Sequence, residues 1–164
     1  ERTMWECVRL LKEAKMVHII ATGNSCNVSR YMGFRLERMG IRSIYDDLPE
    51  YYINHINLSR EGEILIAISK SGTSKTVIRG MELAKERGLK TIAITASAQS
   101  PVSRLADYLL ISSGKQEPFM MEKGYVYMNE FAVAEALLHF VTNQDLIQST
   151  QANKPEIVLS DYKL

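Results

Sequence analysis

Two short segments of the sequence combine glycine with hydroxyl side chains, a pattern suited to holding an anion. They read Ala21-Thr22-Gly23-Asn24-Ser25 and Ser69-Lys70-Ser71-Gly72-Thr73-Ser74. Glycine lets a ligand approach the backbone closely, and serine and threonine hydroxyls supply hydrogen-bond donors. Each segment leads into a helical pattern, and the first turn of a helix offers unpaired N–H groups and a favourable dipole. A phosphate monoester, with three outer oxygens, fits this donor set well.

The same segments could instead be ordinary turns whose hydroxyls cap the following helices, with no ligand. One such segment alone would favour that explanation, whereas two on neighbouring strands favour anion binding. The pattern is not a Walker A loop, because the glycine spacing and the Gly-Lys-Ser/Thr ending are missing. It is not a dinucleotide fingerprint either, because Ala21-Thr22-Gly23 lacks the first glycine of that motif.

Five short apolar runs predict the strands that position these segments: residues 17–21, 43–45, 64–68, 91–95 and 108–112. Several are apolar almost without interruption, which suits strands covered on both faces of a parallel sheet. Helical periodicity alternates with them, at residues 4–14, 26–39, 75–87 and about 125–143. The alternation predicts an α/β fold: a three-layer sandwich whose five-stranded parallel sheet has the flavodoxin-like order 2-1-3-4-5. Ligands of such sheets bind beyond the carboxyl ends of the strands, here between the first and third, where both segments lie.

The composition of the chain is that of one globular domain. It has 164 residues, of which 46% are apolar and 24% charged. We expect a single domain over residues 1–164, with a core over about 1–143 and a C-terminal tail over 144–164. Lys and Arg number 20 and Asp and Glu 19, a net charge of +1, so no basic nucleic-acid footprint is visible.

Apolar runs, the amino end and the cysteines predict the cellular compartment of the protein. No apolar run approaches the ~20 residues of a membrane span, and the amino end does not have the pattern of a signal peptide. Two cysteines, Cys7 and Cys26, suit a reduced protein. We therefore expect a cytoplasmic protein without membrane contact. The start at Glu1 without an initiator Met suggests a fragment whose missing flanks carry part of the function.

The two glycine-hydroxyl segments resemble the phosphosugar-binding loops of the sugar isomerase (SIS) domain family. Residues 69–74 resemble its Ser-x-Ser-Gly-x-Thr/Ser loop, and residues 21–25 its Gly/Ala-x-Gly-x-Ser turn. Segments at 63–69, 84–88, 91–95 and 100–107 follow the family in order, so the resemblance covers about residues 1–143. It implies that a phosphorylated sugar is the ligand. The binding residues it implies are Gly23, Asn24, Ser25, Ser69, Ser71 and Ser74, with the backbone amides of Lys70, Gly72 and Thr73.

Within the family, the chain is most similar to the sugar-phosphate-sensing domain of RpiR-type transcriptional regulators. Asp46-Asp47 and the segment 129–137 carry this likeness. It implies a homodimer or tetramer with ligands near the subunit boundary, and a role in transcriptional regulation of carbohydrate metabolism. DNA would then be bound only through an N-terminal helix-turn-helix domain that this sequence lacks.

One carboxylate lies on the apolar side of the last predicted helix. At 100° per residue, Glu130 falls near the middle of an apolar arc over residues 127–141. Three explanations stay open. Glu130 could sit in the first turn and reach solvent past the edge of the core. It could accept hydrogen bonds from sugar hydroxyls. It could also move a proton between C1 and C2, as a glutamate near this point does in isomerising members of the resembled family.

Most of the histidines and cysteines are expected to have structural and not catalytic roles. His18 lies in a buried strand and is predicted to be a satisfied core residue, and Cys26 a small buried residue at a helix start. His55 lies in a predicted helix, where a surface role or an acid–base role beside Glu130 are the two possibilities. No spacing of His, Cys and carboxylates resembles a metal site, and we expect no cofactor. Phe119, Met120 and Met121, in a polar loop, suggest an oligomer contact or a lid.

These observations support three functions. The favoured one is an effector-sensing domain that binds a phosphorylated sugar or amino sugar. The alternative is a small aldose–ketose sugar-phosphate isomerase that uses Glu130 as its base, with His55 as a partner. The third is a dimerisation scaffold without ligand. The sensing domain is preferred because the set of catalytic side chains is small.

Overall fold

The computed structural model describes residues 2–112 and 127–148. Five parallel strands form one sheet: β1 (Met16–Ile20), β2 (Ser43–Tyr45), β3 (Glu63–Ile68), β4 (Lys90–Thr95) and β5 (Tyr108–Ile111). Their spatial order is β2-β1-β3-β4-β5. The predicted α/β class and strand order are confirmed. Phe119, Met120 and Met121, and the tail beyond residue 148, lie outside the described residues.

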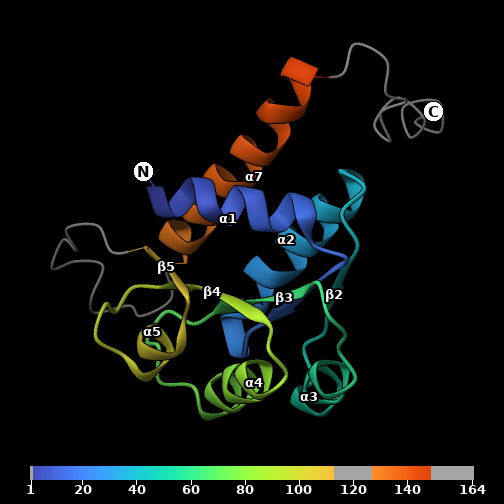
Figure 1. Cartoon of the computed structure of the whole chain (residues 1–164). Coiled ribbons are helices and arrows are strands. Elements are labelled where there is room, and N and C mark those ends of the chain that lie inside the picture. The colour runs from blue at the N-terminus through green and yellow to red at the C-terminus, as the bar shows by residue number, and fades with distance from the viewer. Residues whose placement is uncertain (1, 113–126, 149–164) are drawn as a thin grey trace, which may run out of the picture.

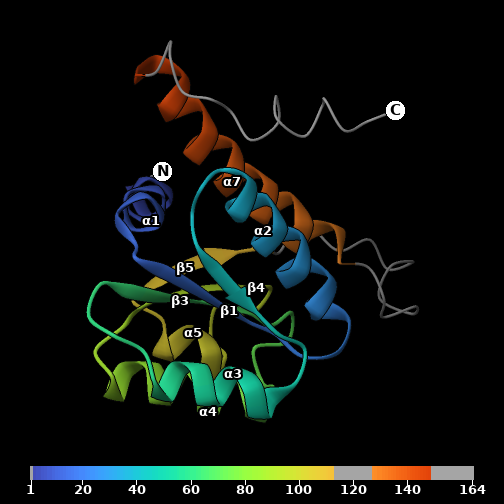
Figure 2. The ribbon, with the colours of Figure 1, turned by 90° about the vertical axis from the view of Figure 1, so that its right-hand side faces the viewer.

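Helices cover both faces of this sheet (Figures 1 and 2). One layer holds α1 (Arg2–Glu13), α2 (Cys26–Arg38) and α7 (Met128–Gln148). The other holds α3 (Pro49–Asn57), α4 (Lys75–Glu86) and α5 (Pro101–Leu105). A short 3₁₀ helix, η1 (Gly23–Ser25), links β1 to α2. The last helix runs to Gln148, beyond the predicted end near residue 143. No helix in the described ranges is long and apolar enough to cross a bilayer.

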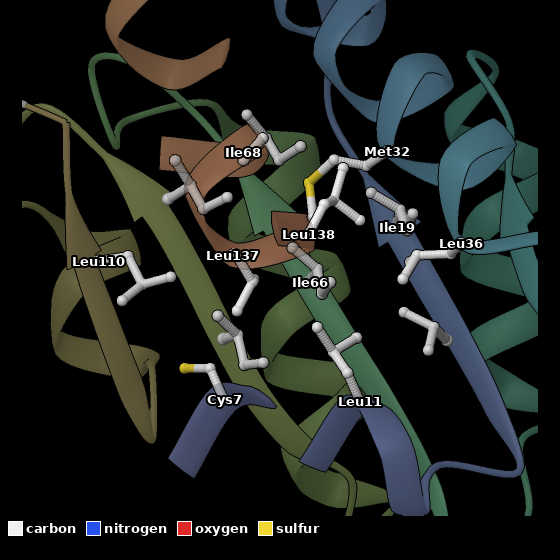
Figure 3. Packing of buried hydrophobic residues seen from close by; sticks show 14 of the residues in the cluster. Cys7, Leu11, Ile19, Met32, Leu36, Ile66, Ile68, Leu110, Leu137 and Leu138 are labelled. Carbon is white, nitrogen blue, oxygen red and sulfur yellow. The ribbon is translucent and has the colours of Figure 1, made fainter. Parts of the chain in front are cut away.

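Side chains of the central strands enter two separate cores, one on each face of the sheet. Ile19 and Ile66 pack with α1, α2 and α7, whereas Ile20 and Leu65 pack with α3 and α4. Figure 3 shows the first core, in which Leu137 and Leu138 of α7 lie over the strands. Because successive strand residues face opposite layers, a strand buried on both faces must be apolar throughout. This explains the uninterrupted apolar runs in the sequence.

The buried histidine of β1 is paired across the sheet. His18 lies on the α3–α4 face, and its Nε2 is 2.6 Å from Oε2 of Glu63 in β3. A buried polar ring needs such a partner, because an unpaired one carries the full cost of its lost hydration. The prediction that His18 is a satisfied core residue is confirmed.

Candidate functional site

The two glycine-hydroxyl loops meet at the carboxyl edge of the sheet. The first follows β1 and the second follows β3, which is the neighbour of β1. Oγ1 of Thr22 and Oγ of Ser74 lie 2.8 Å apart, at hydrogen-bond distance, although 52 residues separate them. The strand order therefore brings together two segments that are distant in the chain, at the switch point where ligands of such sheets bind.

The first loop turns tightly into α2. Gly23 has φ +59, a left-handed conformation that glycine adopts without the penalty of a Cβ. Gly23 and Asn24 are exposed, whereas Ser25 is buried where η1 passes into α2. Two of the predicted binding residues of this loop are therefore exposed, and the third, Ser25, is buried.

The second loop is held by hydrogen bonds of its own. The backbone N–H of Gly72 donates to Oγ of Ser69 at 3.2 Å and to the Ser69 carbonyl oxygen at 3.1 Å. Oγ of Ser71 lies 2.9 Å from Oγ1 of Thr73, and it also accepts from the Thr73 backbone N–H at 3.3 Å. Ser69 is buried, whereas Ser71 and Thr73 are exposed. Ser71 and Thr73 thus form the accessible rim of this loop.

The glycine of the second loop fits a space that no side chain could enter. Gly72 has φ +67, and a Cβ added to it would lie 2.0 Å from Oγ of Ser100 and 2.3 Å from Cβ of Ser100. The loop is therefore packed directly against the start of α5. The Gly72 carbonyl also accepts from the backbone N–H of Val102 in that helix at 3.1 Å.

The helix starts at this edge differ in how their backbone N–H groups are satisfied. At α5, the Ser100 side chain accepts from the Ser103 N–H at 3.2 Å, an ordinary N-cap. In the described part of the chain, the N-cap residues Thr22, Ser25 and Ser74 make no such side-chain bond to η1, α2 or α4. Ser74 instead directs its hydroxyl at Thr22 and at Thr76, whose Oγ1 is 3.4 Å away. The first turns of η1, α2 and α4 therefore have no side-chain cap, whereas the N–H groups of Gly72 and Thr73 within the second loop already donate to Ser69 and Ser71.

Charged groups border the two loops. The Lys70 ammonium lies 5.3 Å from the ring centroid of Tyr127, at the entry to α7, so a cation from the second loop sits against the last helix. On the other side, Arg30 of α2 pairs with Asp47, which follows β2. Burial, followed by the charge of Asp47 and a hydrogen bond to it, raises the pKa of the Cys26 thiol above its ordinary value of 9.0. Cys26 is buried at the start of α2, as predicted.

Glu130 lies inside the protein at the same edge of the sheet. Its side chain is 1% exposed, and Oε1 accepts a hydrogen bond from Oγ of Ser112 at 2.7 Å. Ser112 directly follows β5, and its backbone N–H donates to the Thr95 carbonyl at the end of β4. Among the described residues, Oε2 of Glu130 has no hydrogen-bond partner. The expected place in the first turn is confirmed, but the suggestion that the carboxylate reaches solvent is wrong.

His55 is placed apart from these groups. It lies in the last turn of α3, which runs back from the carboxyl edge of the sheet toward the amino edge, and it is partly exposed. The structure gives no contact between His55 and Glu130. In the described ranges, no group of three or more His, Cys, Asp or Glu side chains could hold a metal ion.

Three residues of the site were not singled out from the sequence. Thr22 joins the loops, Ser112 holds Glu130, and Tyr127 contacts Lys70. A usable signal existed for Thr22 and Ser112, because each is a hydroxyl residue within two positions of the end of a strand. Tyr127 has no comparable signal, because its contact with Lys70 is made between segments that are distant in the sequence.

Comparison with known proteins gives a family match and similar regulators. The SIS domain model matches residues 10–139. RpiR, an HTH-type transcriptional regulator of Escherichia coli K12, is 25% identical over 143 residues, which are 86% of this chain and 48% of RpiR. The chain spans less than half the length of the first curated relatives it matches, between 16% and 48%.

Solved structures share the fold. The NanR protein of Vibrio vulnificus, complexed with ManNAc-6P, has a TM-score of 0.78 at 23% identity, over 87% of this chain and 54% of that one. The sugar isomerase domain of an RpiR transcription factor from Sphaerobacter thermophilus has a TM-score of 0.81 at 21% identity, over 98% of this chain and 85% of that one. The family model covers most of the sequence and includes both loops, and the chain therefore belongs to the SIS domain family.

Proposed function

We propose that the chain binds a phosphorylated sugar or amino sugar as the effector-sensing domain of a transcriptional regulator of carbohydrate metabolism. The observation that carries the proposal is the pair of loops joined by Thr22 and Ser74, both leading into helices whose N-cap side chains point elsewhere. A phosphate dianion can accept from hydroxyls and amides of both loops at once. Each charge-assisted bond contributes about 1.5–3 kcal/mol, which is enough to offset the cost of association when several form together.

Two of the similar proteins support a sensing role. RpiR is a transcriptional regulator, and the NanR structure is a complex with ManNAc-6P. By analogy, a helix-turn-helix domain elsewhere in a longer protein would contact DNA. This chain would report ligand binding to that domain, as a homodimer or tetramer in the cytoplasm. The net charge of +1 agrees with a domain that does not itself bind DNA.

A thermal-shift screen tests the proposal. The chain is melted with a panel of hexose and amino-sugar 6-phosphates, ManNAc-6P included, and with the same sugars lacking phosphate. A ligand that binds the native state and not the unfolded chain raises the melting temperature, and the rise increases with the ratio of free ligand to Kd. We expect a rise with at least one ester and none with its free sugar.

Two serine variants decide where such a ligand binds. The double variant Ser69→Ala/Ser71→Ala removes two hydroxyls of the second loop and should abolish the shift. The matched control is Ser59→Ala, which removes a serine hydroxyl between α3 and β3, at the opposite edge of the sheet. The control should keep the full shift. Equal shifts in the double variant and the wild type would contradict the proposed site.

A second function, aldose–ketose isomerisation, is favoured by one observation. The Oε2 atom of Glu130 is buried, and no described residue gives it a hydrogen bond. A carboxylate held in this way could take the C2 proton of an aldose phosphate and return it to C1, while a proton moves from O2 to O1. His55 would serve as the acid–base partner only if it came from another subunit, because its own chain holds it away from Glu130.

Solvent exchange separates the two functions. The best ligand of the screen is incubated with the chain in deuterated water, and its C1 and C2 positions are followed by NMR. The sensing function predicts binding without deuterium uptake. Uptake that is lost in Glu130→Gln would establish the isomerase instead.

A further inference from the structure

Thr95, the last residue of β4, contacts the second loop through its hydroxyl group. The residue is fully buried. Its Oγ1 donates to the carbonyl oxygen of Lys70 at 3.2 Å and accepts from the backbone N–H of Ser97 at 3.3 Å. Because Ser97 is the donor in the second bond, the single hydroxyl proton of Thr95 is directed at Lys70. A valine side chain, which has a similar shape, could make neither bond.

The contact fixes the orientation of one peptide group in the second loop. The Lys70 carbonyl also accepts from the backbone N–H of Ala96 at 3.1 Å, so two donors hold this oxygen toward the end of β4. A trans peptide is planar, and its carbonyl and N–H groups point in opposite directions. The N–H of this peptide belongs to Ser71 and therefore points away from β4. No backbone group of the described residues accepts from it.

The order of the strands gives this direction a meaning for the site. In the sheet, β3 lies between β1 and β4. A group at the end of β3 that points away from β4 therefore points to the side of β1, which the first loop follows. The Ser71 N–H is thus directed to the side on which Thr22 and Ser74 join the two loops.

Other carbonyl groups of the second loop are also bonded within the protein. The Ser69 carbonyl accepts from the Gly72 N–H, and the Gly72 carbonyl accepts from Val102 of α5. A carbonyl oxygen carries a partial negative charge and would repel a phosphate group. These bonds, with the one from Thr95, keep the carbonyl oxygens of the loop turned toward protein donors.

We propose that Thr95 is a positioning residue for the phosphate site: its hydroxyl holds the Lys70 carbonyl toward β4 and thereby presents the Ser71 N–H to the ligand. The bond is already made without ligand, so this donor needs no ordering when the ligand binds. Without the hydroxyl, the peptide between Lys70 and Ser71 is held less firmly and its carbonyl can turn toward the anion. The inference rests on the proposed function, since it requires a phosphate group at the second loop.

The test compares phosphate affinity with stability in three variants. Thr95→Val removes the hydroxyl and keeps the branching of the side chain, whereas Thr95→Ser keeps the hydroxyl. Thr91→Val is the matched control, because Thr91 is equally buried near the start of the same strand, where its Oγ1 donates to Oδ2 of Asp107 at 3.0 Å. Inorganic phosphate and the best sugar phosphate of the screen are titrated into each protein at one ionic strength. The melting temperature is measured without ligand.

For Thr95→Val we expect a Kd about fivefold higher for each phosphate compound that the wild type binds, the effect of one hydrogen bond of ordinary strength. Thr95→Ser should bind as the wild type does. Both valine variants lose buried hydrogen bonds and should melt at a lower temperature, but Thr91→Val should keep the Kd of the wild type. A purely structural role of Thr95 predicts instead that the two valine variants behave alike.

The amide signal of Ser71 gives a second readout, which follows the peptide itself. In the ¹⁵N-labelled wild type, the phosphate compound that binds most tightly should move this amide proton downfield, because a hydrogen bond to an anion forms. The displacement at saturation should be smaller in Thr95→Val. If the ligand leaves the Ser71 signal of the wild type in place, the inference is overturned, even where Thr95→Val does not fold.

The outcomes separate this inference from the function on which it rests. If Thr95→Val binds phosphate as tightly as the wild type, the positioning role is overturned while the phosphate site stands. The role is overturned as well if Thr91→Val weakens binding as much as Thr95→Val does. If the wild-type chain binds neither inorganic phosphate nor any sugar phosphate, the proposed function fails, and the inference fails with it.

Discussion

Thr22 and Ser74 join the two loops of the candidate site through their hydroxyl groups, which lie 2.8 Å apart. Neither hydroxyl caps its own helix within the described residues, although serine and threonine at these positions ordinarily do. The contact crosses from the β1 loop to the β3 loop and so fixes the spacing of the two sets of donors. A ligand that needs both sets would find them already in place.

A double-mutant cycle measures this contact. Thr22→Val and Ser74→Ala each remove one hydroxyl, and the double variant removes both. Because the bond is partly buried, we expect a coupling energy of about 1 kcal/mol in the free energy of unfolding by urea. Single-variant effects that add within about 0.3 kcal/mol would show that the two side chains do not interact.

Replacing Gly72 should damage the second loop severely. Gly72→Ala forces a Cβ to within 2.0 Å of Oγ of Ser100 and places alanine at φ +67. Backbone strain and overlap together should lower the free energy of unfolding by about 3 kcal/mol or more. Gly40→Ala is the control, because Gly40 has φ +80 but no atom within 4 Å of an added Cβ.

Urea unfolding of the two glycine variants checks this prediction. Gly40→Ala should show the backbone cost alone, about 1–2 kcal/mol. If Gly72→Ala were no less stable than Gly40→Ala, the close packing of the second loop on α5 would be disproved.

The hydrogen bond between Ser112 and Glu130 should stabilise the fold, because both groups are buried. Ser112→Ala leaves both carboxylate oxygens of Glu130 without a described side-chain partner, and this should cost about 1–3 kcal/mol of stability. Adding Glu130→Met to this variant replaces the buried carboxylate with an apolar side chain of similar length. We expect the double variant to regain most of the loss. A double variant that is less stable still would mean that the carboxylate is itself stabilising.

Alkaline pH should destabilise the fold through its buried thiols. Burial raises the pKa of Cys7 from 9.0 to about 12, and the pKa of Cys26 is also raised. As the pH rises through 9, the unfolded chain loses these protons while the folded chain keeps them, so the free energy of unfolding falls between about pH 9 and pH 12.

Urea unfolding at several pH values tests this linkage. The decline above pH 9 should be less steep in Cys7→Ala than in the wild type, once the constant cost of the cavity is subtracted. Equal slopes in the two proteins would contradict a raised pKa for the Cys7 thiol. A thiol reagent at pH 8 offers a second check, since both cysteines should react only after unfolding.

Much of this architecture followed from the spacing of apolar residues. Uninterrupted apolar runs indicated strands buried on both faces, and their alternation with helical patterns indicated the sheet order that the structure shows. The 3.6-residue period of the last helix also placed Glu130 on its buried side correctly, and the structure shows it 1% exposed.

The spacing of apolar residues could not predict which distant segments contact one another. Tyr31 donates to Glu135 across 104 residues, linking α2 to α7, and nothing in the local sequence of either helix indicates that they meet. Periodicity tells which face of an element is buried, whereas packing decides what that face touches.

The most direct measurement follows the backbone amide signals of the ¹⁵N-labelled chain during titration with glucosamine 6-phosphate and, separately, with glucosamine. The account predicts that the ester moves the signals of residues 23–26 and 70–76 most strongly, and that the free amino sugar at the same concentration leaves them in place. Equal responses to both compounds, or the largest changes at the amino edge of the sheet, would contradict it.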